Sequence, residues 1–173
     1  PQQILPRFER EQAEVVQLLE RQGIEPSAPL IAVHPWSSNP RKQWPADRFT
    51  DLIRRLAGHA SRQVVVIGGP EEVERASHVL PAGVPVANLV GQLTLTQLAA
   101  LLQRSSCLVS NDSGPAHLAA AVGTKAVVLF GTPQASAGPR RWGPWGPGHA
   151  VIWKPAMEAI TVEEVYHEIV RSL

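Results

Sequence analysis

Hydrophobic residues follow two alternating spacings along this chain of 173 residues. Short, continuous apolar runs predict buried strands at residues 30–33, 64–67, 86–89, 107–109, 126–130 and 151–153. Between these runs, apolar residues recur every three or four positions, which predicts helices. The predicted helices cover residues 7–22, 48–57, 71–80, 94–103, 115–122 and a terminal segment that begins after Thr161.

Local signals mark where several of these helices begin and end. Gly23 is the predicted stop of the first helix, and Asp47 is the predicted N-cap of the second. Thr161, with Glu164 three residues later, predicts a capping box. Residues 131–148 include five Gly, four Pro and two Trp, so we expect a loop there. The apolar sides of the first two helices would bury Phe8, Val15, Leu18, Leu19, Phe49, Leu52, Ile53 and Leu56.

The predicted strands are apolar throughout and do not alternate with polar positions. Strands of this kind are buried on both faces, and their regular alternation with helices predicts a parallel sheet covered by helices on both sides. The predicted fold class is α/β, a single Rossmann-like domain over residues 1–173.

Composition narrows the classes of function. Lys and Arg number 16 against 15 Asp and Glu, so the net charge of +1 provides no broad basic surface for nucleic acid. Cys107 is the single cysteine, which excludes a disulfide within the chain and favours the cytoplasm. The sequence has no signal peptide and no run of roughly 18 apolar residues that would span a membrane. Because it begins at Pro1 and not at Met, we expect it to be part of a longer protein.

Ligands of open parallel sheets bind beyond the carboxyl ends of the strands, so the segments that follow the strands carry the candidate chemistry. In the most specific of them, Ser113 and Gly114 lead into a helix whose free N–H groups and dipole suit a phosphate. His117 lies one turn further along and can face the same ligand. The alternative is that Asp112 or Ser113 only caps this helix, while His117 packs beneath it.

Two further segments add polar groups at the same edge of the sheet. Ser37 and Ser38 supply hydroxyls after the first strand, and Lys42, in a loop stiffened by prolines, is a candidate for a phosphate contact. Glu71 and Glu72 follow the second strand. The helix dipole stabilises acidic side chains at this place. In nucleotide-binding α/β domains an acid here often binds a ribose hydroxyl.

Several common motifs are missing from the sequence. It contains no G-x-G-x-x-G after a strand and no G-x-x-x-x-G-K-[ST], which disfavours NAD binding and P-loop NTPase activity. It contains no G-x-S-x-G, so Ser113 is a poor candidate for a hydrolase nucleophile. His34, Asp112 and His117 lack the spacing of metal ligands, and no metal site is expected.

Four motifs occur in order between Leu30 and the last helix. They are Lys-x-Trp-Pro at 42–45, Gly-Gly-x-Glu-Glu at 68–72, Asp-Ser-Gly-x-x-His-Leu-Ala-Ala-Ala at 112–121 and Phe-Gly-Thr-Pro at 130–133. Together they resemble the carboxyl-terminal half of glycosyltransferase family 9, the family of ADP-heptose:lipopolysaccharide heptosyltransferases. Gln134 and the Trp- and Arg-rich loop 140–146 depart from the family pattern and put the identity of the sugar in doubt.

The resemblance implies a GT-B architecture, in which two Rossmann-like domains enclose the active site. This chain would be the donor-binding domain of an inverting transferase that moves heptose, or a similar sugar, from an ADP-heptose-like donor to a lipopolysaccharide or glycan acceptor. The acceptor-binding amino-terminal domain, with the catalytic base, is expected to lie outside this chain. No cofactor is expected. The implied location is cytoplasmic, and is compatible with peripheral association of the full-length protein at the inner face of the inner membrane.

The resemblance also assigns roles to single residues. It implies that Lys42 and Asp112 take part in catalysis, with Asp112 near the donor sugar. Either Glu71 or Glu72 would take the ribose hydroxyls, and His117 would lie near the phosphates or the sugar. Contacts with the diphosphate and the base pocket would come from Ser37, Ser38, Lys42, Ser113, Gly114 and, for the base, Leu93.

Two alternatives stay open beside this interpretation. A GT-B nucleotide-sugar epimerase would isomerise or hydrolyse the nucleotide sugar without an acceptor. A non-catalytic nucleotide-sugar-binding module would bind the donor and transfer nothing.

Overall fold

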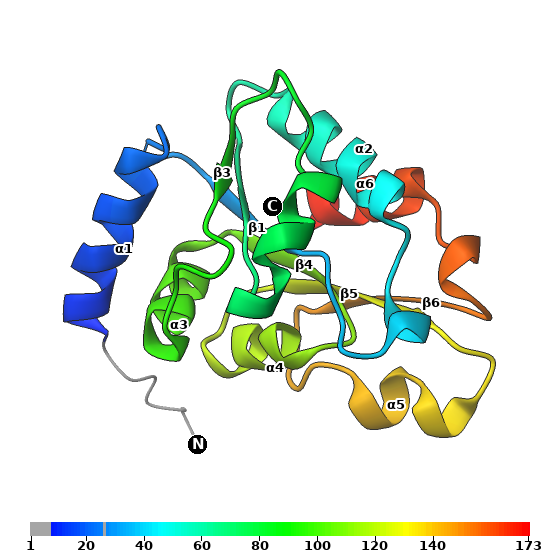
Figure 1. Ribbon diagram of the computed structural model, residues 1–173. Coiled ribbons are helices and arrows are strands. Elements are labelled where there is room, and N and C mark those ends of the chain that lie inside the picture. The colour runs from blue at the N-terminus through cyan, green and yellow to red at the C-terminus, as the bar shows by residue number, and fades with distance from the viewer. Residues whose placement is uncertain (1–7, 26) are drawn as a thin grey trace.

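Residues 8–25 and 27–173 are described by a computed structural model, in which six strands form one parallel sheet (Figure 1). The spatial order of the strands is β3-β2-β1-β4-β5-β6, so β1 and β4 are central neighbours. Val33 in β1 pairs with Val66 of β2 on one side and with Val109 of β4 on the other. The strands are β1 (Leu30–His34), β2 (Gln63–Val66), β3 (Val86–Asn88), β4 (Cys107–Asn111), β5 (Ala126–Gly131) and β6 (Ala150–Lys154).

Helices cover both faces of the sheet (Figure 1). Helices α1, α3 and α4 pack on one face, and α2, α6 and the 3₁₀ helix η2 pack on the other. The α-helices are α1 (Glu9–Arg21), α2 (Ala46–Ala57), α3 (Leu95–Arg104), α4 (Gly114–Ala121), α5 (Pro139–Trp142) and α6 (Val162–Ser172). The 3₁₀ helices are η1 (Pro40–Lys42), η2 (Pro70–His78), η3 (Ala135–Ala137) and η4 (Met157–Ala159).

The two helical layers explain why the central strands lack polar positions. In β1, Ile31 and Val33 join the apolar cluster on the α2 side, whereas Leu30 and Ala32 join the cluster on the α1 side. Side chains of successive strand residues point to opposite faces, so both sets must be apolar. The predicted fold class is confirmed. Strand β6 departs from the pattern because it lies at an edge of the sheet, and there Val151 is exposed.

Several predicted helix ends are confirmed. Gly23 follows α1 with a φ of +75°, a backbone conformation that glycine adopts without strain. The Thr161 hydroxyl accepts a hydrogen bond from the N–H of Glu164, whose carboxylate in turn accepts from the N–H of Thr161. Arg7, the predicted first residue of α1, lies outside the described residues.

Three predictions of local structure were wrong. Asp47 does not cap α2, because the helix begins at Ala46 and Pro45 occupies the N-cap position. The fixed φ of proline sets the entry of the chain there, and Asp47 lies within the first helical turn. The helix predicted over 71–80 has other bounds, because it is the 3₁₀ helix η2, which begins at Pro70 and ends at His78. The predicted loop 131–148 contains η3 and the single-turn helix α5.

Two further observations bear on the expectations from composition. Cys107 is buried in β4, and burial raises the pKa of its thiol to about 12, so the sulfur stays protonated and unreactive at neutral pH. Among the described residues, no helix is both long enough and apolar enough to cross a bilayer.

The close approach of β5 to η4 gives the first prediction. A Cβ atom added at Gly131, the last residue of β5, would lie 2.2 Å from the backbone nitrogen of Met157. Backbone atoms cannot move aside as a flexible side chain can, so we expect Gly131→Ala to lower the free energy of unfolding by about 1–3 kcal/mol or more. Urea denaturation of the two proteins measures the difference.

Gly114→Ala is the matched control, because a Cβ at Gly114 meets nothing within 4 Å. This variant should keep its stability or gain a few tenths of a kcal/mol from the better helix propensity of alanine. Equal losses for the two substitutions would contradict the steric argument.

Candidate functional site

The winding of the chain reverses between β1 and β4, which is the place where open parallel sheets bind their ligands. His34, the last residue of β1, pairs in register with Ser110 of β4. Strand β4 continues to Asn111, so Ser110 and Asn111 end this strand where we had expected them to follow it. His34, Ser110, Asn111 and Asp112 therefore gather at the carboxyl edge of the two central strands.

The side chain of Asn111 ties the loop 35–45 to the sheet. Its amide nitrogen donates a hydrogen bond to the carbonyl of Pro35 at 2.9 Å, and its amide oxygen accepts one from the N–H of Trp44 at 3.0 Å. Asn111 is completely buried, so these bonds satisfy backbone groups that water cannot reach. Both ends of the loop that carries Lys42 are thus fixed by one residue of β4.

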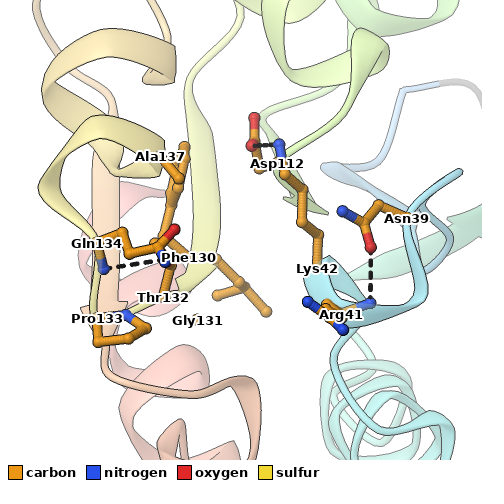
Figure 2. Close-up of a pocket in the computed structure, with 11 residues that line it drawn as sticks. Asn39, Arg41, Lys42, Asp112, Phe130, Gly131, Thr132, Pro133, Gln134 and Ala137 are labelled. Atoms are coloured by element: carbon orange, nitrogen blue, oxygen red, sulfur yellow. Dashed lines mark hydrogen bonds and ion pairs between the residues drawn. The ribbon is translucent and has the colours of Figure 1, made fainter.

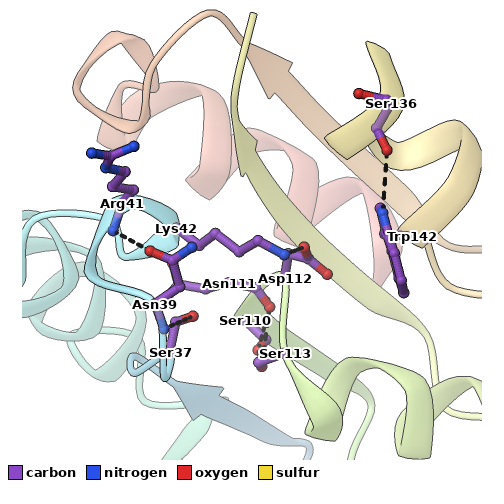
Figure 3. A network of polar contacts seen from close by, with 10 residues as sticks. All are labelled: Ser37, Asn39, Arg41, Lys42, Ser110, Asn111, Asp112, Ser113, Ser136 and Trp142. Carbon is purple, nitrogen blue, oxygen red and sulfur yellow. Dashed lines mark hydrogen bonds and ion pairs between the residues drawn. The ribbon is translucent and has the colours of Figure 1, made fainter. Parts of the chain in front are cut away.

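Lys42 and Asp112 form an ion pair at the mouth of this edge (Figure 3). Lys42 Nζ lies 2.5 Å from Asp112 Oδ2. The side chain of Asp112 is only 8% exposed, whereas that of Lys42 is 39% exposed. A carboxylate so nearly buried is costly without a cation, and Lys42 supplies it. The predicted phosphate contact and the predicted sugar contact are therefore direct partners in the structure.

A cavity of about 390 Å³ opens beside this ion pair (Figure 2). We call it the larger cavity. Lys42 and Asp112 stand on one side of it, and Thr132 and Gln134 stand on the opposite side. Its lining mixes apolar residues with polar ones and carries both signs of charge. The lining residues are Asn39, Arg41, Lys42, Asp112, Leu129, Phe130, Gly131, Thr132, Pro133, Gln134 and Ala137.

A second cavity of about 210 Å³, the smaller cavity, lies between the end of β2 and the start of α4. Gly68 and Gly69 form part of its wall and present backbone only, which allows a planar group to approach closely. Most of its other walls are apolar. The lining residues are His34, Ile67, Gly68, Gly69, Leu93, Thr94, Leu95, Leu98 and Pro115.

His34 lies beneath the start of α4. Its Nδ1 is 3.2 Å from Ser113 Oγ and 3.4 Å from Ser110 Oγ, and its ring meets Trp36 edge to face. Burial lowers the pKa of His34 to about 4, because the charged imidazolium would lose its hydration there. The ring is therefore neutral at physiological pH.

The structure distinguishes the two acidic candidates in η2. The carboxylate of Glu72 accepts a hydrogen bond from the N–H of Gly69 at 2.5 Å and so caps the start of η2. Glu71 is exposed, and its carboxylate lies next to Gly69 at the rim of the smaller cavity. Leu93 lines the same cavity, as expected of a base pocket.

Five other candidates line neither of the two cavities. Ser113 occupies the N-cap position of α4 but makes no capping bond with its side chain, and Asp112 binds Lys42. Neither residue therefore caps the helix with its side chain, although Ser113 stands at the N-cap position. His117 is exposed, so it does not pack beneath the helix either. The other three residues that line neither cavity are Ser37, Ser38 and Gly114.

Sequence reasoning missed the roles of His34 and Asn111. The available signal was a polar residue at the carboxyl end of an otherwise apolar parallel strand, where the side chain is buried and needs a partner. As for metals, no group of three or more His, Cys, Asp or Glu side chains that could hold an ion occurs within residues 8–25 and 27–173.

The sequence and fold are similar to those of known glycosyltransferases. A sequence model described as glycosyltransferase family 9 (heptosyltransferase) matches residues 2–168. Lipopolysaccharide heptosyltransferase 3 of Escherichia coli is 30% identical over 128 residues, which cover 71% of this chain and 36% of that protein.

Solved structures show the same fold. A glycosyl transferase family 9 protein from Veillonella parvula DSM 2008 has a TM-score of 0.85 and 23% identity, over 95% of this chain and 51% of its own. The E. coli heptosyltransferase WaaC with ADP has a TM-score of 0.75 and 23% identity, over 93% of this chain and 49% of its own. The chain thus spans between about a third and a half of the length of these proteins.

The bridge made by Asn111 gives a second prediction. Asn111→Ala leaves the N–H of Trp44 and the carbonyl of Pro35 without partners in a buried place. We expect a loss of about 2–5 kcal/mol in the free energy of unfolding, since each orphaned buried group costs about 1–3 kcal/mol. Asn39→Ala is the control, because Asn39 also accepts a backbone N–H, that of Arg41, but is exposed. The free energy of unfolding of Asn39→Ala should fall by less than about 1 kcal/mol. Losses of similar size in the two variants would contradict the role of Asn111 as a bridge.

The neutral His34 gives a third prediction, on pH. In the unfolded chain this ring takes up a proton below about pH 6.5, whereas in the folded protein it does so only near pH 4. Between these values the unfolded state binds more protons, so stability falls as the pH falls from about 6.5 to about 4. The contribution of His34 is roughly 3 kcal/mol.

Unfolding free energies at pH 7 and pH 4.5 should therefore differ less in His34→Gln than in the wild type. His149→Gln is the control, because burial also lowers the pKa of His149, in a less buried setting. A pH dependence of His34→Gln equal to that of the wild type would show that folding does not lower the pKa of this histidine.

Proposed function

Because the chain belongs to glycosyltransferase family 9, we propose that it is the donor-binding half of an inverting GT-B glycosyltransferase. In this proposal the whole protein transfers heptose, or a similar sugar, from an ADP-heptose-like donor to a lipopolysaccharide or glycan acceptor. The acceptor site and the catalytic base belong to a second, amino-terminal domain that this chain does not contain. The family match favours a transferase over a nucleotide-sugar epimerase.

The observation that carries the proposal is an ion pair that lines the larger cavity at the switch point of the sheet, with the smaller cavity at the same edge. The smaller cavity has the glycine wall and leucine lining that suit a purine base. The larger cavity has carboxylate, amide and hydroxyl groups that suit a sugar. The start of α4 lies between them, where the N–H of Gly114 and the helix dipole suit a diphosphate. Pro115 has no N–H, and the N–H of Ala116 donates to the carbonyl of Ser113. The solved WaaC structure with ADP supports the nucleotide assignment by analogy of fold.

Lys42 and Asp112 would exchange partners when the donor binds. The diphosphate competes with Asp112 for the Lys42 ammonium, and the freed carboxylate accepts hydrogen bonds from sugar hydroxyls. The two halves of the donor thus replace the two halves of the ion pair, which avoids an unpaired charge at a nearly buried site. During transfer, Lys42 and the helix dipole of α4 stabilise the negative charge that grows on the leaving diphosphate.

The remaining predicted residues would contact the ribose or surround the diphosphate. Glu71, with its carboxylate at the rim of the smaller cavity, is the better candidate than Glu72 for a ribose hydroxyl, because Glu72 already caps η2. Ser37, Ser38, Ser113 and Gly114 border the path of the diphosphate, and His117 lies at the outer side of α4. Reaching the phosphates from there requires movement of the His117 side chain.

The fourth prediction tests the exchange of partners by calorimetric titration with ADP and adenosine in EDTA. Lys42→Ala should weaken ADP binding by about ten- to a hundredfold and leave adenosine binding unchanged, because a charge-assisted contact contributes about 1.5–3 kcal/mol. Asp112→Asn should strengthen ADP binding, because Lys42 no longer has to leave a carboxylate. It should weaken binding of the complete nucleotide sugar.

Arg41→Ala is the matched control, since Arg41 lies next to Lys42 and its guanidinium makes no ion pair in the described structure. It should change ADP affinity by less than about threefold, as an exposed charge does. Equal losses for adenosine and ADP in Lys42→Ala would refute the phosphate assignment. A fall in ADP affinity in Asp112→Asn would refute the exchange.

A further inference from the structure

One ring nitrogen of the buried His34 has no partner among the residues that the structure describes. His34 is 7% exposed, and its Nδ1 faces the hydroxyls of Ser113 and Ser110. The other nitrogen, Nε2, makes no hydrogen bond to any described residue, yet it is not among the fully buried polar atoms that lack a partner. It is therefore open to the smaller cavity, which His34 lines.

The hydrogen bonds around Ser113 indicate which nitrogen carries the proton. Ser110 Oγ donates to the carbonyl of Asn111 at 2.8 Å, so its proton is already used. The proton of Ser113 Oγ then goes to Ser110 Oγ at 2.8 Å, with the carbonyl of Asn111 as a second acceptor at 3.2 Å. Ser113 Oγ is left as an acceptor toward His34, and Nδ1–H is the donor. A neutral imidazole with its proton on Nδ1 presents a lone pair at Nε2.

The position of His34 indicates which part of a nucleotide would meet that lone pair. Its Nδ1 is hydrogen-bonded to Ser113, the N-cap residue of α4, where the proposed diphosphate would bind. The ring also shares the smaller cavity with Leu93 and Leu98, which suit the base. In a nucleotide the ribose lies between base and phosphates, so a ligand placed as under the proposed function brings its ribose to His34.

We propose that His34 Nε2 accepts a hydrogen bond from a ribose hydroxyl of the nucleotide donor and so selects ribonucleotides over deoxyribonucleotides. The inference rests on the proposed function, because that function places the nucleoside in the smaller cavity. A neutral acceptor suits a hydroxyl and gives no attraction to phosphate. The network through Ser110 and Ser113 fixes the tautomer before the ligand arrives, which makes His34 a specificity-determining residue.

Titration with ADP, 2′-deoxy-ADP and 3′-deoxy-ADP tests the proposal. The wild type should bind ADP about tenfold more tightly than at least one of the two deoxy nucleotides. His34→Phe keeps a flat ring and removes the acceptor, so that preference should fall to within about twofold. His59→Phe is the control, because His59 is exposed and stacks on Tyr166 away from the cavity. It should keep the full preference.

A uniform loss for all three nucleotides in His34→Phe would overturn the inference and leave His34 as a support of α4. An unchanged preference would overturn it as well. If the wild type binds none of the three nucleotides, both the proposed function and the inference about His34 are wrong. If the wild type binds all three with equal affinity, only the inference about His34 is wrong.

A measurement on the wild type covers the case in which His34→Phe does not fold. The ¹⁵N chemical shift of His34 Nε2 should have the value of an unprotonated nitrogen in the free protein. It should move when ADP is added and should move less with the deoxy nucleotide that binds more weakly. A protonated Nε2 in the free protein would overturn the assignment of the tautomer and the proposal with it.

Discussion

The amide of Asn111 is the interaction on which the arrangement of the site depends. A parallel sheet leaves its carboxyl edge open, and the loops beyond that edge have no strand to hold them. Asn111 solves this for the loop 35–45 by pairing with a carbonyl near its start and an N–H near its end. Because the residue after Asn111 is Asp112, the same turn of chain that anchors the loop also sets the carboxylate against Lys42 (Figure 3).

The ion pair then fixes the electrostatics of the edge. A carboxylate that is 8% exposed requires a cation, and Lys42 is the one that the anchored loop delivers. The two charges therefore balance each other in the free protein. A phosphate would compete for Lys42, and a sugar hydroxyl would compete for Asp112. A ligand that carries both groups can replace both partners at once, whereas free phosphate would strand the carboxylate. Under the proposed function, the burial of Asp112 would therefore favour a complete nucleotide sugar over phosphate alone.

The sequence predicted the fold well because its signals are local. Continuous apolar runs such as 64–67 and the Thr161–Glu164 capping box depend on neighbours in the chain, and the structure confirms both. Asp47 failed as an N-cap because Pro45 had already fixed the entry of α2. The relation of Lys42 to Asp112 could not be predicted, since the two residues are 70 positions apart and meet only when β1 and β4 become neighbours.

The same loop also links the two cavities. Trp36 follows β1 and is 1% exposed, and a Cβ at Gly68 would come within 2.6 Å of its indole ring. The indole also meets the ring of His34, so this end of the loop supports the wall of the smaller cavity. The other end carries Lys42 into the larger cavity. Since one anchored segment contributes to both cavities, it would fix the distance between the base and the sugar of the proposed donor before binding. This lowers the entropy that binding must overcome.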